Sequence, residues 1–209
     1  KPGDASHEQF KEDTGSLQLY RFWMKDGEKK TVLFIADERV GVHEHMEQIG
    51  SNWEKFTCSR DANCYFCGMK KRSSYVEYSS VWDMTPYKSK DGKDRKYSKR
   101  AFPNYGASIE ILNRRRQEKG GSLAGHYVDC FRDGDKTSNV GNDFTVGEKT
   151  DLSKLASMAV NPTDVKPFDF EKLLAPQSPE KIEARLRFQG THVATTPRSS
   201  VKNDEDIPF

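Results

Sequence analysis

Hydrophobic and polar residues alternate with a period of two over much of the chain, which is the spacing of half-buried β-strands. The longest apolar run, Thr31–Ala36, lies inside a predicted buried strand that covers Lys30–Asp37. The preceding segment, Ser16–Lys25, alternates as well, and the turn Asp26-Gly27 separates it from that strand. Because strands joined around Asp-Gly commonly form hairpins, the sequence predicts that these two strands pair.

More strands are predicted downstream, together with one long helix and three short ones. Residues 38–50 are predicted to be a loop, and Lys88–Lys96 a charged loop. The long helix is predicted at Ser108–Lys119, where apolar residues recur at helical spacing, and it ends at Gly120-Gly121. The further strands are Asn52–Cys58, Ser74–Lys88, Tyr97–Tyr105, Leu123–Arg132 and Asp143–Val146, and the short helices are Asp151–Met158, Phe168–Ala175 and Pro179–Arg187.

These elements predict a mainly β fold, an OB-fold-like barrel with one or two short helices. A β-sandwich fits the same pattern. The barrel is expected to span residues 16–158, followed by a helical extension over residues 159–189. Residues 1–15 and 190–209 are polar and carry no core pattern, so we expect a disordered N-terminal segment and a flexible, disordered acidic C-terminal tail.

The composition limits the size of the core and the classes of protein. Hydrophobic residues make up 34% and charged residues 32% of the 209 residues, so much of the chain is expected in solvated loops or tails. No apolar run approaches the roughly 18 residues of a membrane span. The polar, acidic first residues exclude a secretory signal from the chain as given. We therefore expect a cytoplasmic protein with no membrane partner.

Three of the four cysteines lie close together in the sequence, at Cys58, Cys64 and Cys67. Cys64 and Cys67 form a C-x2-C turn that is followed directly by a glycine, and two thiolates at this spacing bind one tetrahedral ion. With His45, the pattern H-x12-C-x5-C-x2-C supplies three sulfur ligands and one nitrogen ligand, a closed set for structural zinc. We therefore predict zinc as the cofactor, bound in an inserted knuckle over residues 43–67.

Other interpretations of these residues remain open. His43 competes with His45 as the fourth ligand. The three cysteines can instead pack as reduced thiols in a core. Cys64 and Cys67 can also form a redox couple, although no thioredoxin-like βαβ pattern surrounds them. The fourth cysteine, Cys130, lies in an apolar strand and is predicted to be a buried thiol.

The net charge of +2 conceals a segregation of charge along the sequence. Residues 68–132 hold 15 basic and 7 acidic side chains, whereas residues 1–67 and 133–209 each carry a net charge of −3. A basic middle between acidic flanks is typical of a polyanion-binding body. Aromatic residues interleave with these cations, and single-stranded nucleic acid needs both, since cations track the phosphates and rings stack on unpaired bases. The candidate DNA-binding residues are Lys70, Lys71, Arg72, Tyr75, Tyr78, Trp82, Tyr87, Lys88, Lys93, Arg95, Lys96, Tyr97, Lys99, Arg100, Phe102, Arg114 and Arg115.

Burial is the competing explanation for the rings, because about half of the aromatic residues on an alternating strand face the core. Trp82 has apolar neighbours and fits a core position, whereas Tyr87 and Tyr97 stand beside charged loop residues and are expected to be exposed. Arg114 and Arg115 belong to a run of three arginines that wraps around the predicted helix. One of the three can therefore be merely solvated.

The end of the given sequence combines acidic and apolar residues. An apolar Phe that carries a terminal carboxylate is suited to a partner pocket with a basic rim, so the tip is a candidate partner-binding site. Its acids can also compete with DNA for the basic surface. The residues of the tip are Asp204, Glu205, Asp206, Ile207, Pro208 and Phe209.

This tip resembles the one through which bacterial single-stranded DNA-binding proteins recruit replication and repair enzymes. The order of the four candidate zinc ligands resembles the zinc site of the T-even phage helix-destabilising proteins, with a shorter middle gap. From Leu17 to about Leu155 the chain is similar to a group of phage single-stranded DNA-binding proteins, through the segments FWMKDGEKKTVLFI, VWDMTPY and GHYVDCFRDGDKTSNVGNDF. The resemblance implies an OB-fold and a location in the host bacterial cytoplasm. The bacterial proteins are usually tetramers with a glycine-rich linker, which this chain lacks, so the oligomeric state stays open.

We therefore expect a non-enzymatic protein that coats single-stranded DNA without sequence preference in phage DNA replication and recombination, and whose tip recruits replication or repair proteins. One alternative is a metal-dependent nuclease that uses Asp37, Glu38, His43 and His45 around a catalytic ion. Another is an RNA-binding or transcriptional adaptor with a zinc ribbon, although a ribbon normally carries a second C-x2-C, which is absent. No glycine loop of the kind that binds nucleotides is found in the sequence.

Overall fold

The computed structural model of the chain describes two compact units. The described residues are 19–49, 52–89, 92–134, 138–159 and 162–190. The first unit takes in the described residues of Lys1–Val42 and Tyr75–Ala175, and the second takes in those of His43–Ser74 and Pro176–Phe209. The predicted disordered segment at residues 1–15 and the tip at residues 204–209 lie outside the described residues.

The described part of the chain is mainly β, as predicted, with a large antiparallel sheet and a few short helices. The strands are β1 (Lys29–Ile49), β2 (Asn52–Cys58), β3 (Ser74–Asp83), β4 (Tyr87–Lys88), β5 (Asp94–Arg95), β6 (Ser98–Tyr105), β7 (His126–Phe131) and β8 (Asp143–Lys149). The helices are α2 (Tyr65–Gly68), α3 (Ala107–Glu118), η1 (Leu152–Lys154), α4 (Leu155–Met158), η2 (Pro162–Val165), α5 (Phe170–Leu173) and α6 (Pro179–Gly190).

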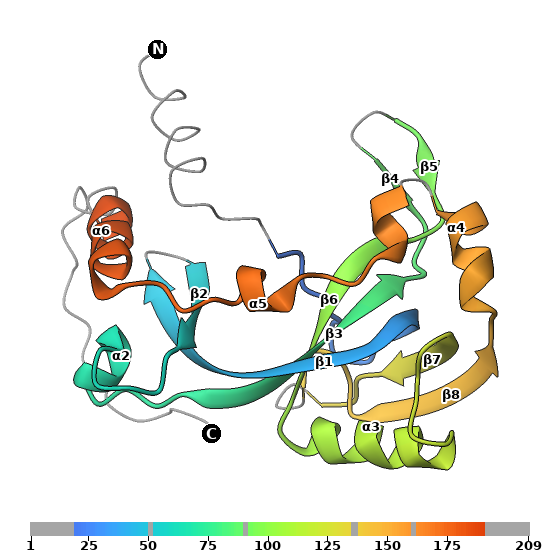
Figure 1. The fold of residues 1–209 in the computed structure, drawn as a ribbon, viewed down its shortest axis with the longest axis horizontal. Helices are drawn as coiled ribbons and strands as arrows, with labels where there is room; N and C mark the ends of the chain where they lie inside the picture. The colour runs from blue at the N-terminus through green and yellow to red at the C-terminus, as the bar shows by residue number, and fades with distance from the viewer. Residues whose placement is uncertain (1–18, 50–51, 90–91, 135–137, 160–161, 191–209) are drawn as a thin grey trace. The chain divides into compact units, whose positions relative to one another are not determined.

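Six of these strands form one sheet, with the order β6-β3-β1-β7-β8 and with β2 paired to β1. The strands β4 and β5 form a separate two-stranded hairpin. Between β6 and β7 the chain forms α3, which lies beside β8 (Figure 1). The Arg115 side chain on α3 ties the two together, since its Nε–H donates to the Phe144 carbonyl of β8 at 3.0 Å.

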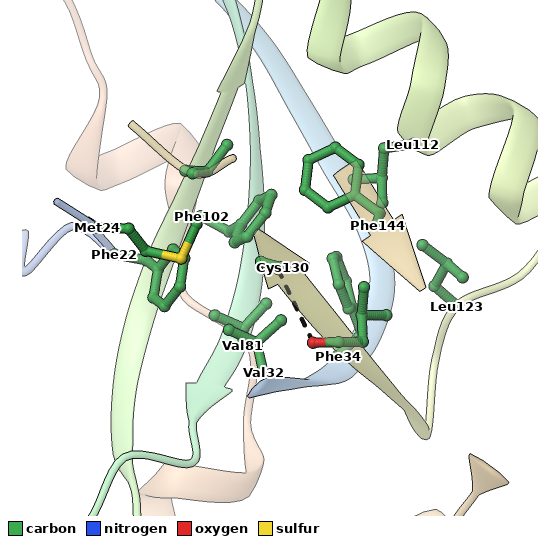
Figure 2. Packing of buried hydrophobic residues seen from close by; sticks show 12 residues of the cluster. Phe22, Met24, Val32, Phe34, Val81, Phe102, Leu112, Leu123, Cys130 and Phe144 are labelled. Atoms are coloured by element: carbon green, nitrogen blue, oxygen red, sulfur yellow. Dashed lines mark hydrogen bonds between the residues drawn. The ribbon is translucent and has the colours of Figure 1, made fainter. Parts of the chain in front are cut away.

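The largest hydrophobic core of the first unit collects aromatic rings from several strands. The rings of Phe22 and Phe102 stack with centroids 5.4 Å apart, and the Phe34 ring lies tilted at 5.5 Å from Phe102 (Figure 2). Leu112 from α3 is 2% exposed and belongs to the same cluster. Cys130 is fully buried there, and its thiol donates to the Val128 carbonyl at 3.8 Å, so the predicted buried thiol is confirmed.

Four aromatic residues that we predicted to bind DNA lie in the core instead. Tyr78, Trp82 and Phe102 are 0% exposed, so their ring faces are already covered by protein and the stacking role assigned to them is wrong. Tyr97 is 5% exposed although we expected it at the surface. The reason is its pairing with Trp82, because the two rings stack with centroids 4.1 Å apart and an interplanar angle of 15°.

The predicted hairpin between Ser16–Lys25 and the following strand is wrong. From Leu19 onward the described segment runs along β6 instead, where the Phe22 N–H donates to the Ala101 carbonyl at 2.7 Å and the Ala101 N–H donates to Tyr20. The burial of Phe22 explains this choice, since its ring joins the core and draws the segment away from β1.

The predicted loop at residues 38–50 is also wrong, because β1 continues without interruption to Ile49. Its last part pairs antiparallel with β2, from His43 opposite Cys58 to Ile49 opposite Asn52. This pairing provides hydrogen-bond partners for the backbone of a segment whose charged residues are typical of a loop. The C-x2-C turn of the predicted knuckle forms the single helical turn α2.

Candidate functional site

A cluster of metal-binding side chains is assembled in the second unit from three elements. β1 carries His45, β2 ends at Cys58, and α2 begins directly after Cys64 and contains Cys67. Three of the four residues are buried, and Cys67 is exposed. These are the four residues that the sequence pattern predicts as ligands.

The turn between β2 and α2 brings the cysteines together. The Asp61 carboxylate accepts hydrogen bonds from the Ser59 hydroxyl and from the Asn63 backbone N–H, both at 2.8 Å. Arg60 adopts a left-handed conformation with φ of 59°, and its N–H donates to the Cys58 sulfur at 3.3 Å. The chain therefore reverses sharply after β2, and this reversal places Cys64 beside Cys58.

The four ligand atoms lie at distances that fit one tetrahedral ion. The Cys58 sulfur is 3.6 Å from that of Cys64 and 3.4 Å from that of Cys67. The His45 Nε2 is 3.4 Å from the Cys64 sulfur and 3.5 Å from the Cys67 sulfur. Zinc–sulfur bonds of about 2.3 Å and zinc–nitrogen bonds of about 2.0–2.1 Å would separate the ligands by about 3.5–3.8 Å. The cluster can therefore hold a metal ion, and its geometry is compatible with zinc.

The structure selects His45 over His43 as the nitrogen ligand. The His45 Nδ1 lies 3.0 Å from the Arg72 carbonyl. Because a carbonyl only accepts, Nδ1 carries the proton and Nε2 keeps its lone pair toward the sulfur atoms, the arrangement typical of metal-binding histidines. His43 lies outside the cluster, with its Nδ1 3.5 Å from the Ser73 hydroxyl.

The thiols of the cluster compete for protons. Burial alone raises the pKa of Cys64, but hydrogen bonds from the Cys67 backbone N–H and from the side chains of Cys67, Cys58 and His45 lower that pKa to about 6. Hydrogen bonds to Cys58 and Cys64, together with burial, raise the pKa of Cys67 to about 12. A lowered pKa favours the thiolate form of Cys64, and the thiolate is the form of cysteine that binds a metal ion.

Aromatic packing encloses the cluster. The Phe66 ring is 1% exposed and lies 5.3 Å from the His45 ring and 4.9 Å from the Phe56 ring, measured between centroids. Four protein ligands leave no open position for a substrate, and such closed sets are typical of structural rather than catalytic sites. The cluster is therefore suited to hold the second unit together.

A separate cavity of about 600 Å³ lies in the first unit, where the β4–β5 hairpin meets β6. Its side chains are mostly cationic, hydroxylic or aromatic, and one carboxylate faces the same space. The residues that line it are Tyr20, Tyr87, Lys88, Ser89, Arg95, Tyr97, Ser98, Lys99, Arg100 and Asp164.

Two tyrosine rings and several cations of this cavity reach solvent. Tyr20 is 55% exposed and Tyr87 is 43% exposed, and the Arg100 guanidinium lies over the Tyr20 ring at 5.4 Å. Lys88 is exposed on β4, and Arg95 stands on β5 directly opposite Tyr87. Exposed rings beside cations are the two groups that unpaired bases and phosphates require.

Other lining residues have structural partners. The Lys99 ammonium donates to the Thr163 carbonyl at 3.0 Å and lies 4.5 Å from the centre of the Phe168 ring. Burial lowers the pKa of Lys99, and nearby Asp164 partly offsets this effect. Asp164 in turn accepts from the Tyr97 hydroxyl at 3.0 Å. These contacts fix the wall of the cavity that is formed by β6 and η2.

The remaining predicted DNA-binding residues do not line the cavity. Lys93 and Lys96 are exposed near β5, and Tyr75 is 45% exposed on β3. On α3, Arg114 is exposed and Arg115 pairs with Glu118 at 3.2 Å. The three predicted DNA-binding residues of the second unit are all exposed, and they are Lys70, Lys71 and Arg72. Lys71 forms an ion pair with Glu47.

The sequence analysis missed several exposed or cavity-lining residues. Tyr20 shares its alternation with the buried Phe22 and Met24, so the pattern gives no signal for its exposure. Trp23 and Trp53 are 48% and 62% exposed and were not considered. The cavity-lining residues without a sequence signal are Tyr20, Ser89, Ser98 and Asp164.

The residues proposed for a nuclease do not form a second metal cluster in the described part of the chain. The only group of three or more potential ligands found there is the His–Cys cluster, which contains neither Asp37 nor Glu38. The Asp37 carboxylate instead accepts a hydrogen bond from the Leu123 N–H at 3.1 Å. Asp37 therefore has a structural role where β1 meets the segment before β7.

No known protein family, curated protein or solved structure matches this chain. Among the helices of the described residues, none has both the length and the apolar character needed to cross a membrane.

Proposed function

We propose that this chain is a single-stranded DNA-binding protein of the phage type, which coats DNA without strong sequence preference during replication and recombination. The observation that carries the proposal is the cavity of the first unit, where the exposed rings of Tyr20 and Tyr87 stand beside Lys88, Arg95 and Arg100. The basic middle of the sequence, which includes these cations, supports a polyanionic ligand.

The strand order supports an oligonucleotide-binding barrel as the architecture. Numbered without β2 and the β4–β5 hairpin, the strands of the first unit occur in the order third, second, first, fourth, fifth, with a helix between the third and fourth. This is the strand order of an OB barrel, in which the second and third strands carry much of the nucleic-acid surface. Here those two strands are β3 and β6, and β6 forms one wall of the cavity.

The binding chemistry follows from the two kinds of side chain. Lys88 and Arg95 would track the phosphates, and release of their counterions would make binding fall with salt. The rings of Tyr20 and Tyr87 would stack on bases, and each stacked base contributes about 1–3 kcal/mol without discriminating strongly between sequences. In a duplex the base faces are covered, so single strands are expected to bind better.

Zinc is the metal that the cluster fits best. His45, Cys58, Cys64 and Cys67, of which only Cys67 is exposed, would hold it as a structural ion that stabilises the second unit. The acidic tip at residues 204–209 would recruit a replication or repair partner, as its resemblance to the bacterial proteins implies. A host bacterial cytoplasm, where thiols stay reduced, suits such a site.

The proposal is tested by titrating a labelled mixed-sequence single strand and its duplex with the purified protein and following fluorescence anisotropy. We expect the single strand to bind at least tenfold more tightly than the duplex and to remain intact. Equal affinity for the duplex would overturn the proposal, shortening of the strand with magnesium or manganese would favour the nuclease, and a preference for RNA would favour the adaptor.

Tyr87→Ala tests the cavity itself. Loss of one stacking ring is expected to weaken binding by about 1–3 kcal/mol, which is roughly 5- to 150-fold. Phe131→Ala is the matched comparison, because Phe131 is an exposed ring of the first unit that neither lines the cavity nor was predicted to bind DNA. Undiminished affinity in Tyr87→Ala would remove the cavity from the proposal.

A further inference from the structure

The helix α6 completes the hydrophobic core around the metal-binding cluster. Ile182 is 3% exposed and packs in one buried cluster with two of the metal-binding cysteines, and Leu186, one turn later, packs against the same cluster. The other buried members of this core are Ile49, Phe56, Cys58, Cys64 and Phe66. The sulfur atoms and the helix therefore share one core, although more than a hundred residues separate them in sequence.

The same face of α6 also contacts β2 through a charged side chain. The Arg185 guanidinium forms an ion pair with Glu54 at 2.6 Å and lies 5.4 Å from the centre of the Phe56 ring. Both charged side chains are largely covered, with 25% and 17% exposure. Arg187 lies on the outer side of the helix, 77% exposed, and forms an ion pair within the helix, with Glu183 at 2.6 Å.

This core is small. It contains six buried residues, and small units of this kind usually need a metal or disulfides to fold. Two of the six are cysteines of the cluster, so a bound metal would fix the positions of side chains that belong to the same core as Ile182. Within the described residues, Ile182 and Leu186 join α6 to this core.

We propose that α6 packs against the rest of the second unit only while the His–Cys cluster holds its metal, so that the metal state decides whether this helix is fixed or free. The inference rests on the proposed metal centre and is independent of DNA binding. Since coupling between two equilibria is reciprocal, docking of α6 raises the metal affinity by the same factor by which the metal favours docking.

Hydrogen exchange on the full chain, followed by mass spectrometry under reducing conditions, tests the first half of the coupling. One sample carries stoichiometric zinc and the other has been stripped with a chelator. We expect the amides of α6 to exchange at least about tenfold faster without zinc, whereas those of α3 in the first unit stay unchanged. Equal protection of α6 in both samples, or joint loss of protection in α6 and α3, would overturn the inference.

Zinc affinity, measured by competition with a chromophoric chelator, tests the reciprocal half. Ile182→Ala removes the docking contact but keeps a good helix former, so it is expected to lower the zinc affinity about tenfold, within the usual range of coupling energies. Arg185→Ala is expected to act in the same direction. Arg187→Ala is the matched control on the outer side of α6 and should leave the affinity unchanged.

Unchanged zinc affinity in Ile182→Ala contradicts the coupling. The two proposals fail in different ways. Elemental analysis that finds no stoichiometric zinc in the wild-type protein rejects the metal centre and the inference with it. If the protein holds stoichiometric zinc but the hydrogen exchange of α6 does not depend on that zinc, only the inference is rejected.

Discussion

At the scale of single residues, the metal-binding cluster is the part that the sequence predicts best. The cysteine spacing predicts three of the ligands, because a C-x2-C turn with a third thiol nearby is typical of a tetrahedral metal site. The choice between His43 and His45 could not be made from the sequence, since it depends on the Arg72 carbonyl, which reaches His45 only through the fold. The aromatic residues were harder to place, because core and surface rings occur with the same spacing along β3 and β6.

The ligand assignment predicts the metal content of cysteine variants. Cys58→Ala is expected to lose stoichiometric zinc, because three ligands no longer close the tetrahedral site. Cys130→Ala should keep its zinc, since that thiol is buried in the first unit, outside the cluster. Elemental analysis of the two purified variants distinguishes them, and zinc retained by Cys58→Ala would show that the cluster is not the metal site.

A second residue-scale prediction concerns the pH dependence of stability at Asp129. The Thr31 hydroxyl donates to this carboxylate at 2.6 Å and Lys29 pairs with it at 3.1 Å, and both contacts lower the pKa of Asp129. A lowered pKa stabilises the folded state above the ordinary carboxyl pKa of about 4, and this contribution is lost as the pH falls through the folded-state value.

Asp129→Asn should therefore destabilise the protein at neutral pH, by less than about 1 kcal/mol because the site is partly solvated. The difference from wild type should begin to shrink below about pH 4 and vanish as the pH falls through the lowered pKa at which the folded carboxylate takes up its proton. Urea unfolding at several pH values measures this, and a difference that grows toward acid would contradict the assignment.

At the scale of elements, the sequence predicts buried runs well and strand ends poorly. Strands β2 and β6 and the helix α3 lie where the alternation and the helical spacing put them. The length of β1 was missed, because the residues after Asp37 are charged and contain a glycine. Pairing with β2 supplies the backbone hydrogen bonds of these residues. Such pairing cannot be predicted from the sequence of either strand alone, because it depends on the partner strand.

The glycine inside β1 gives an element-scale prediction. A Cβ at Gly41 would lie 2.2 Å from the Tyr75 hydroxyl and 2.8 Å from Cζ, so Gly41→Ala must displace the ring that crosses it. The ring belongs to an exposed side chain and can move, so the cost should be only about 1 kcal/mol.

The double variant Gly41→Ala with Tyr75→Ala separates this contact from backbone effects. Without the ring, the alanine should be neutral or stabilise by about 0.4–1 kcal/mol, because it restricts the unfolded chain. A double-mutant cycle by thermal unfolding measures the coupling, and equal effects of Gly41→Ala in both backgrounds would mean that the Tyr75 ring does not matter.

At the scale of the whole molecule, the division into two units could not be predicted. Each unit is assembled from two stretches of sequence, and the second joins the knuckle to the C-terminal helix α6. The sequence analysis placed the helix correctly but assigned it to a separate extension, because the match between Ile182 and the cysteine core has no local signature. The basic middle and acidic flanks of the chain, by contrast, can be found from the sequence, because counting charged residues is enough to detect them.

Salt dependence gives a whole-molecule prediction. The logarithm of the affinity for a single strand should fall with the logarithm of the salt concentration, with a slope of about −0.7 for each phosphate neutralised. Replacing both Lys88 and Arg95 by Gln should reduce the magnitude of this slope by about 1.4. The same change at Lys149 and Lys172, which are exposed but do not line the cavity, should leave the slope unchanged. Titrations at four salt concentrations decide between these outcomes, and flat salt dependence would contradict an electrostatic surface.

The three tryptophans differ in their exposure to solvent, so their intrinsic fluorescence can report on separate parts of the protein. Trp82 is fully buried and donates to the Asp164 carbonyl at 2.9 Å, so its emission should respond little to a ligand at the surface. The two exposed indoles, Trp23 and Trp53, fall one in each compact unit. A Trp53→Phe variant would therefore report events in the first unit and a Trp23→Phe variant those in the second, without any attached dye.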